Sequence, residues 1–145
     1  MTVRIRVVKL DDDLPLPSYA REGDAGLDLF STQDMTLQPG ERAALATGIS
    51  LEIPPGFAGF VHARSGRALN EGLAVVNAPG VIDSGYRGEV VVIAVNLDPG
   101  EEIHVKRGDK IAQLVIQRVE TATLEAVDDL PSSPRGPGGF GSSGR

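Results

Sequence analysis

Cysteine and tryptophan are both absent from this chain of 145 residues. Without cysteine there is no disulfide framework, no thiolate zinc site and no cysteine nucleophile. Aromatic residues are few, with four Phe and two Tyr, so Val, Ile, Leu and Ala have to build the core. Positive charge is in the minority, since 14 Lys and Arg stand against 20 Asp and Glu, for a formal charge of −6. This balance argues against bulk binding to nucleic acid or an anionic membrane, and leaves open a small anion held by a local arginine cluster.

Long hydrophobic runs are absent as well. No apolar stretch approaches the length of a membrane span, and the first 13 residues do not resemble a signal peptide. We therefore expect a cytoplasmic protein. Apolar residues make up 41% and charged residues 23% of the chain, which is typical of a single globular domain.

Glycine (18) and proline (10) are too abundant for a helical bundle. Turn signals such as Gln38-Pro39-Gly40 and Asp98-Pro99-Gly100 separate short β-rich runs, a pattern that indicates a sandwich or barrel of antiparallel strands. One short helix is expected over residues 65–72, closed by a glycine. The predicted strands cover residues 2–9, 42–53, 57–63, 72–77, 88–97, 101–106, 110–119 and 121–127.

The composition changes from Asp128 onward. Residues 131–134 form a Pro/Ser linker, and residues 135–144 are so rich in glycine that they cannot fold alone. We therefore divide the chain into a β domain over residues 1–127 and a linker with a Gly-rich arm over residues 128–145. Arg135 and Phe140 could close over a ligand through a cation and a flat ring, although a disordered terminus is the commoner outcome for such a composition.

Asp83 is the first candidate for chemistry. It follows an apolar pair and precedes a tight turn, in a segment that joins two apolar strands. An aspartate is ionised at pH 7 and can take a proton from water, and Tyr86 and Arg87 beside it offer an aromatic face and a cation that suit a nucleotide. On these residues alone, an aspartate chosen for turn geometry remains the commoner alternative.

Three further segments carry polar groups in positions that need explaining. Arg64-Ser65-Gly66 would place a guanidinium, a hydroxyl and free N–H groups at the start of the short helix, which suits an anion, although Ser65 could equally be an N-cap. Gln113 lies in an apolar strand, where its amide needs a ligand or a neighbouring backbone as partner. Asp24 and Asp28 would share one face of a strand, and we expect one to cap a turn and the other to pair with an arginine. The sequence shows no Ser-His-Asp order, zinc spacing or P-loop.

Taken in order, these segments resemble the five motifs of the trimeric dUTP pyrophosphatases (dUTPases). The resemblance runs from residue 24 to residue 144, and its third and fifth motifs are the specific ones. It implies an all-β fold, a jelly-roll-like antiparallel β-barrel with a flexible Gly-rich C-terminal arm, which forms a homotrimer with active sites shared between subunits. The matching segments are Asp24–Leu29, Arg64–Gly66, Gly80–Gly88, Gly108–Leu114 and Arg135–Gly144.

The resemblance also implies a reaction, the hydrolysis of dUTP to dUMP and pyrophosphate. This activity limits uracil in DNA and supplies dUMP for dTMP synthesis. The carboxylate that matches Asp83 would activate the water that attacks the α-phosphorus. Mg²⁺ would be the cofactor, held by the triphosphate oxygens and by waters rather than by protein ligands.

Further roles follow from the resemblance residue by residue. The phosphates would be held by Arg64, Ser65 and Gly66, with Gln113 assisting. The uracil edge would be read by Asn77, by the backbone at Gly80, Val81 and Ile82, and by the paired strand near Val91. Tyr86 would lie against the deoxyribose, where a 2′-hydroxyl would clash. Arg135 would clamp the terminal phosphate, Phe140 would stack on uracil, and Gly141 and Ser142 of the same motif would also contact the substrate. Asp28 would support the site by orienting an arginine.

Two positions depart from the family pattern. Position 67 is Arg, where Leu or Met is more common, and the sequence leaves open whether Arg67 adds a phosphate contact or is a solvated side chain. Lys110 stands where Arg is usual, which keeps the charge but loses the planar fork. Two rival functions remain on the sequence alone: a dCTP deaminase of related fold, which needs a pocket acid/base such as a glutamate, and a non-catalytic module that binds a nucleotide or a protein.

Overall fold

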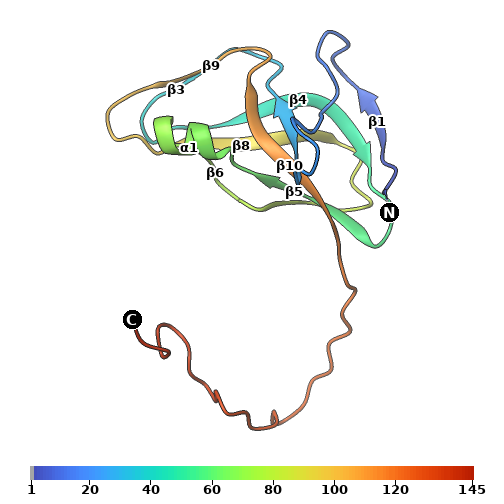
Figure 1. The fold of residues 1–145 in the computed structure, drawn as a ribbon, viewed down its shortest axis with the longest axis vertical. Coiled ribbons are helices and arrows are strands. Elements are labelled where there is room, and N and C mark those ends of the chain that lie inside the picture. The colour runs from blue at the N-terminus through green and yellow to red at the C-terminus, as the bar shows by residue number, and fades with distance from the viewer. Residues whose placement is uncertain (1) are drawn as a thin grey trace.

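The computed structural model describes residues 2–145, which form ten strands and one short helix (Figure 1). In chain order the elements are β1 (Arg6–Lys9), β2 (Gly26–Phe30), β3 (Met35–Leu37), β4 (Arg42–Glu52), β5 (Phe57–His62), α1 (Ser65–Glu71), β6 (Leu73–Val75), β7 (Gly80–Ile82), β8 (Glu89–Asn96), β9 (Ile103–Val105) and β10 (Lys110–Arg118).

Eight of these strands build two four-stranded antiparallel sheets. The strand order is β1-β4-β8-β6 in the first sheet and β2-β10-β5-β7 in the second, while β3 and β9 form a separate two-stranded ribbon. The predicted all-β, jelly-roll-like architecture is therefore confirmed. The strands form two distinct sheets and are not closed into a barrel, which is the double-sheet form of a jelly roll.

The hydrophobic core lies between the two sheets and follows the two-residue period of the strands. In β8, Val90, Val92 and Ala94 are buried, whereas Val91 and Ile93 face outward. Side chains from both sheets join one cluster, and its largest fully buried members are aliphatic rather than aromatic. The shortage of aromatic residues is thus met by Leu, Ile and Val, as the composition predicts.

Asn96 is one of four buried polar residues within residues 2–145, and it has no exposed surface. Its amide nitrogen donates to the carbonyl oxygens of Leu37 (2.9 Å) and Glu101 (2.8 Å), and its Oδ1 accepts from the N–H of Asp98 (2.8 Å). A buried amide is tolerated only when its partners are supplied in this way. Asn96 therefore joins the end of β8 to β3 and to the loop that follows β8.

The strand prediction for residues 121–127 is wrong for the single chain. A strand needs a neighbour for its ladder, and every residue from 117 to 137 is exposed. The short strands β2, β3 and β7 were outside the predicted runs, since three to five residues give little periodic signal and their pairing is set by β10, β9 and β5. β1 is also shorter than its predicted span of residues 2–9.

The C-terminal segment leaves the body after β10 and runs away from it before curling at the C-terminus (Figure 1). Leu124, Leu130 and Phe140 are almost fully exposed there. No helix within residues 2–145 is long and apolar enough to cross a membrane.

Candidate functional site

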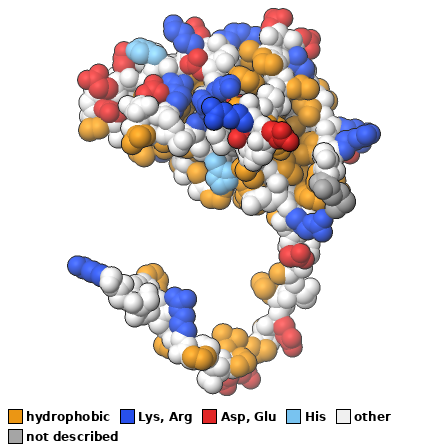
Figure 2. Space-filling view, viewed as in Figure 1, with side chains coloured by type: hydrophobic (Ala, Val, Ile, Leu, Met, Phe, Trp, Pro, Cys, Tyr) orange, Lys and Arg blue, Asp and Glu red, His pale blue; other side chains and the backbone are white. Residues whose placement is uncertain are grey.

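Asp28 on β2 is a buried carboxylate held between two cations. Its Oδ2 lies 2.9 Å from Nζ of Lys110, and its Oδ1 lies 3.5 Å from Nε of Arg64. The residue is only 4% exposed, and a buried charge persists only where opposite charge compensates it. The expectation that one aspartate of the Asp24/Asp28 pair meets an arginine is confirmed. Figure 2 shows Lys and Arg side chains gathered on this face, where α1 lies beside β10.

Pairing between strands brings these groups together. Gln113 on β10 stands opposite Asp28 on β2 and opposite His62 on β5. A register shift between Lys110 and Ala112 accompanies the start of β10. Arg64 follows the end of β5, and its Nη1 donates to the carbonyl of Lys110 at 3.4 Å. Arg64, Asp28, Lys110 and Gln113 therefore occupy one end of the second sheet.

Arg64 keeps an unused donor at this site. Its Nε is buried yet has no hydrogen-bond partner within residues 2–145, because Asp28 at 3.5 Å is near the limit of a hydrogen bond. An unsatisfied buried N–H is costly. Arg64 is also the N-cap residue of α1, and no side chain caps the helix there, so the alternative of Ser65 as N-cap is not observed.

Gly26 is a site feature that the sequence did not single out. A Cβ at this position would lie 2.6 Å from Oε1 of Gln113 and 2.9 Å from its Cβ. The glycine of the first motif thus makes room for the Gln113 side chain over β2. Asp24, two residues earlier, accepts a hydrogen bond from the N–H of Arg21 at 2.9 Å and so caps a turn, as expected.

β7 and β8 lie in different sheets and are joined by the loop of residues 83–88. The expectation that Val91 stands on a strand paired with residues 80–82 is wrong, because Val81 pairs with Phe60 on β5 and Val91 pairs with Ala46 on β4.

The β7–β8 loop and its flanking strands border a hollow with a volume of about 360 Å³. The Tyr86 hydroxyl donates to the carbonyl of Glu89 at 2.8 Å, and a Cβ at Gly88 would lie 2.5 Å from the Tyr86 hydroxyl oxygen. Gly88 therefore allows the tyrosine to lie against the end of its own loop. The hollow is lined by Ala44, Val81, Ile82, Tyr86, Glu89, Val90, Val91 and Ile93.

Asp83 comes directly after β7 and is exposed. Its carbonyl accepts the N–H of Tyr86 at 3.1 Å, and Nη1 of the Arg87 side chain donates to the carbonyl of Ser84 at 2.7 Å, so one backbone and one side-chain hydrogen bond close the turn. Asn77, before β7, lies close to Gly80, where a Cβ would be 3.1 Å from Nδ2 of Asn77. The candidate residues of this segment thus lie on β7 and the loops on either side of it.

Asp83 and Arg64 nevertheless lie at opposite ends of β5. Ile82 pairs with Gly59 and Gly80 pairs with Val61, so Asp83 sits beside the start of β5 and Arg64 follows its end. At about 3.3 Å per residue the two are separated by about 20 Å along the sheet. A single chain does not bring the candidate base and the candidate phosphate-binding residues together.

The candidate residues of the arm form a third group. Arg135 donates from Nε to the carbonyl of Gly138 at 2.9 Å, and Ser142 donates its N–H to the carbonyl of Gly139 at 3.1 Å. Phe140 is fully exposed, and Gly141 next to it has a positive φ of 90°. These contacts run within the arm, away from both the cation cluster and the β7–β8 loop.

Arg67 and its partners were not assigned by the sequence. The guanidinium contacts Glu71 through Nε (2.6 Å) and Nη2 (3.0 Å), donates from Nη2 to the carbonyl of His104 (2.9 Å), and lies 3.5 Å from Oδ2 of Asp109. These hydrogen bonds hold the pKa of Glu71 below its ordinary value and raise that of Arg67. Only the i, i+4 spacing of Arg67 and Glu71 was readable beforehand.

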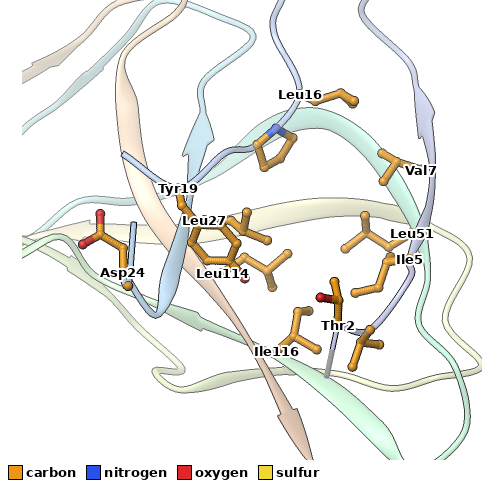
Figure 3. Close-up of a pocket in the computed structure, with 13 residues that line it drawn as sticks. Thr2, Ile5, Val7, Leu16, Tyr19, Asp24, Leu27, Leu51, Leu114 and Ile116 are labelled. Carbon is orange, nitrogen blue, oxygen red and sulfur yellow. The ribbon is translucent and has the colours of Figure 1, made fainter. Parts of the chain in front are cut away.

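A cavity of about 810 Å³ lies elsewhere, between the N-terminal segment and the strands β2 and β10 (Figure 3). Its centre is apolar, with Ile5, Leu27, Leu114 and Ile116 facing one another, and Asp24 stands at its margin. None of the residues to which the resemblance assigns a role in catalysis or binding lines it. A triphosphate needs cations, so this cavity does not suit one.

A smaller hollow of about 390 Å³ is lined mostly by charged rather than apolar side chains. It is lined by Arg64, Arg67, Glu71, Gly108, Asp109 and Lys110. Within residues 2–145 no group of three or more His, Cys, Asp or Glu side chains could hold a metal ion. The two carboxylates that line it are already bonded, Glu71 to Arg67 and Asp109 to the N–H of Lys106 at 2.9 Å, and Asp28 is bonded to Lys110. Cations and bonded carboxylates fit a Mg²⁺ that arrives on a phosphate ligand, since Mg²⁺ usually combines few protein ligands with phosphate and water oxygens.

Comparison with known proteins gives a consistent result. The family model described as dUTPase matches residues 12–144. The chain is 57% identical over 143 residues to the deoxyuridine 5'-triphosphate nucleotidohydrolase of Thermobifida fusca, covering 99% of this chain and 80% of that protein. It is 52% identical over 149 residues to the protein of the same name from Mycolicibacterium vanbaalenii, covering 99% and 97%.

Solved structures of dUTPases are also similar to this chain. The dUTPase of Staphylococcus bacteriophage 80alpha with dUPNHPP matches with a TM-score of 0.90 at 30% identity, covering 99% of this chain and 100% of that one. A mutant dUTPase from phage phi11 of S. aureus, described with a structural Mg(II) ion, matches with a TM-score of 0.80 at 28% identity, covering 89% and 99%. This chain belongs to the dUTPase family.

Proposed function

We propose that this protein hydrolyses dUTP to dUMP and pyrophosphate. The observation that carries the proposal is the hollow beside the β7–β8 loop, which is lined by Val81, Ile82, Tyr86 and Val91. Asp83 comes directly after β7, next to this hollow. Membership of the dUTPase family and relatives named for this activity support it. A nucleotide substrate of this kind suits the cytoplasmic location that we expect.

Asp83 acts as the base in this proposal. Its carboxylate takes a proton from a water molecule while the water oxygen forms a bond to the α-phosphorus. The bond from the α-phosphorus to the bridging oxygen breaks, and its electron pair leaves with pyrophosphate. Exposure of Asp83 in the chain alone leaves it open to substrate, and a base must reach its proton within a hydrogen bond or through one water.

The cation cluster serves the phosphates. Arg64 contributes its guanidinium, including the unpartnered Nε, and Ser65 and Gly66 follow it. Asp28 orients Arg64 and Lys110 through its two oxygens, and Gln113 lies on the same end of the sheet. Fixed cations of this kind neutralise the charge that would otherwise repel an anionic nucleophile.

The hollow beside the β7–β8 loop selects the base and the sugar. Asn77 and the backbone of Gly80, Val81 and Ile82 read the uracil edge, with Val91 of β8 lining the same hollow. The narrow space excludes the 5-methyl of thymine, and cytosine presents the wrong donors and acceptors. Tyr86, held by its bond to Glu89, lies against the deoxyribose and rejects a 2′-hydroxyl.

Mg²⁺ enters with the substrate in this proposal. Bound to the triphosphate oxygens and to waters, it would neutralise charge on the phosphates. The residues of this chain that would face it are the cations Arg64 and Lys110 rather than a carboxylate cage, because Asp28 and Asp109 are already bonded.

The active sites are shared between subunits of a homotrimer. The separation of about 20 Å between Asp83 and Arg64 along β5 supports this assignment, because a base must act within a few ångströms of the phosphate. The cation cluster of one subunit then meets the β7–β8 loop of another.

The division of the chain follows from the same proposal. Residues 1–127 form the catalytic domain, and residues 128–145 are a linker and an arm that closes over an active site. Arg135 clamps the terminal phosphate, Phe140 stacks on uracil, and Gly141 and Ser142 complete the contacts. The wide exposure of the arm in the single chain supports a target outside its own body.

The test is to incubate the purified protein with Mg²⁺ and each of dUTP, dCTP, dTTP and UTP, and to identify the products by chromatography. We expect dUMP and pyrophosphate from dUTP alone. Ammonia from dCTP would identify a deaminase instead, and no product from any of the four, with a folded protein, would favour the binding module.

A further inference from the structure

Arg67 is the best-connected side chain of α1. It makes a bidentate ion pair with Glu71, donates to the carbonyl of His104 on β9, and reaches Asp109 in the turn between β9 and β10. Its side chain is 16% exposed, although α1 has no buried residue. The departure from the family pattern at position 67 is therefore neither a solvated side chain nor an apolar contact.

The helix that carries Arg67 has little else to hold it. α1 has seven residues, too few to be stable by itself. At its C-terminus Gly72 takes the left-handed conformation with φ of 76° and accepts the N–H of Leu97, which fixes that end. At the other end, the contact of Arg64 with the carbonyl of Lys110 is long, at 3.4 Å. Arg67 therefore supplies the short contact of the first turn of α1 with β9, through the carbonyl of His104 at 2.9 Å, and a longer one with Asp109 in the β9–β10 turn at 3.5 Å.

These contacts join the two segments that hold the cations. Asp109 accepts the N–H of Lys106 and precedes Lys110, which pairs with Asp28, and Asp28 pairs with Arg64. Arg67 connects α1 to this series of ion pairs through its contacts with Asp109 and the carbonyl of His104. A displacement of α1 would move Arg64 relative to Lys110.

The same contacts make Arg67 a poor phosphate ligand. Two carboxylates face its guanidinium, and Nε and both terminal nitrogens are engaged by Glu71, Asp109 and the His104 carbonyl. Arg64, in contrast, has a side chain that is 32% exposed against 16% for Arg67, and the carboxylate that it faces, Asp28 at 3.5 Å, is shared with Lys110. The charge of Arg67 is neutralised inside the protein, whereas that of Arg64 is partly available.

We infer that Arg67 is a positioning residue for the phosphate site: its planar fork fastens α1 to the β9–β10 turn and so sets the distance between Arg64 and Lys110. The inference rests on the function proposed above. It predicts that loss of Arg67 weakens binding of the triphosphate and spares binding of the monophosphate product, which lacks the β- and γ-phosphates.

The experiment compares the affinities of the full-length protein for dUpNHpp and for dUMP by calorimetry in the presence of Mg²⁺. For Arg67→Met we expect the Kd of dUpNHpp to rise about tenfold, as misplaced binding groups cause, and the Kd of dUMP to change less than about twofold. Arg42→Met, an exposed arginine of β4, is the matched control and should leave the ratio of the two constants at the wild-type value.

Two conservative variants separate positioning from direct contact. Arg67→Lys keeps the charge but loses the fork, so it should not restore the wild-type ratio. Glu71→Gln keeps the shape but weakens the ion pair, so it should shift the ratio in the same direction as Arg67→Met. A wild-type ratio in Arg67→Lys, or tighter dUpNHpp binding in Glu71→Gln, would overturn the inference, since both indicate a phosphate contact by charge. These variants carry the test if Arg67→Met does not fold.

Hydrolysis of dUTP by the wild-type protein distinguishes failure of the proposed function from failure of the inference about Arg67. If the wild-type protein does not hydrolyse dUTP, the proposed function is wrong whatever the variants do. If the wild type hydrolyses dUTP and all three variants keep its ratio of affinities, only the role of Arg67 is wrong.

Discussion

At the scale of single residues, the two candidate aspartates, Asp28 and Asp83, differ in burial and in the cations that they contact. Asp28 is buried and bonded to Lys110 and Arg64, so it cannot serve as a free base. Asp83 is exposed directly after β7, and within residues 2–145 it forms no ion pair with a Lys or Arg side chain. These surroundings agree with the roles proposed for the two aspartates, Asp28 as a support and Asp83 as the base.

We expect Asp83→Asn to lower kcat for dUTP by about 10²-fold or more, because the amide cannot accept the proton of water. Binding of dUpNHpp should stay within about threefold of the wild type, since the side chain keeps its size. Pyrophosphate release measures the first quantity and calorimetry the second. Asp12→Asn, at an exposed position outside the site, is the control. Near-normal turnover of Asp83→Asn would show that another group is the base.

At the scale of elements, short segments depend on specific side chains rather than on their own cores. α1 buries no residue and is fastened by Arg67 and Gly72. The arm makes its hydrogen bonds internally. Elements with so few contacts to the sheets can be moved or removed without unfolding them.

The contribution of the Arg67–Glu71 ion pair to stability should depend on pH. Hydrogen bonding from Arg67 holds the pKa of Glu71 below its ordinary value of 4.5. A lowered pKa in the folded state means that the ion pair stabilises fully above the unfolded value and is lost as pH falls through the folded value. The Tm difference between the wild type and Glu71→Gln should therefore be constant from pH 7 to about pH 5 and shrink in more acidic solution.

Thermal unfolding of both proteins from pH 7 to pH 3 measures this difference. Glu22→Gln, at an exposed position away from α1, controls for the general effect of removing one negative charge. A difference that does not change with pH would mean that the ion pair does not contribute to stability.

Removal of the arm should separate catalysis from stability. For a chain that ends at Pro134 we expect kcat/KM to fall by about 10²-fold or more, because Arg135 and Phe140 no longer close over the substrate. The Tm should change little, because the arm makes its hydrogen bonds within itself. A chain that lacks only Arg145 is the control. A large fall in Tm would show that the arm is a structural part of the body.

At the scale of the whole molecule, the candidate groups lie in three separate places. The cation cluster and Asp83 occupy opposite ends of β5, about 20 Å apart, and the arm extends away from both (Figure 1). A homotrimer could unite them, with each site taking its parts from different subunits. Symmetric closure would then create equivalent sites at every interface.

This arrangement predicts complementation. Asp83→Asn chains have the arm but no base, and chains that end at Pro134 have the base but no arm. When equal amounts are mixed and refolded, about one site in four should combine a working base with a working arm if the two come from different subunits. Pyrophosphate release from the mixture, compared with each variant refolded alone, measures the recovery. No recovery from demonstrated heterotrimers would mean that base and arm come from the same chain.

Much of the fold was determined by the sequence alone. Frequent Pro and Gly turns and the alternation in runs such as residues 88–97 predicted the long strands, because one apolar face per strand has to be buried whatever its partner. The order of five short motifs predicted the family and the candidate residues. The short helix after Arg64 was predicted by its closing glycine at position 72.

Only the tertiary structure decided which of these residues meet. The pairing of Asp28 with Lys110 depends on the register of β2 and β10, and the fastening of Arg67 depends on a turn that lies 42 residues further along the chain. The strand expected at residues 121–127 has no partner in one chain. Periodicity reports which face of an element is buried, whereas contacts between distant elements arise from packing that no local pattern encodes.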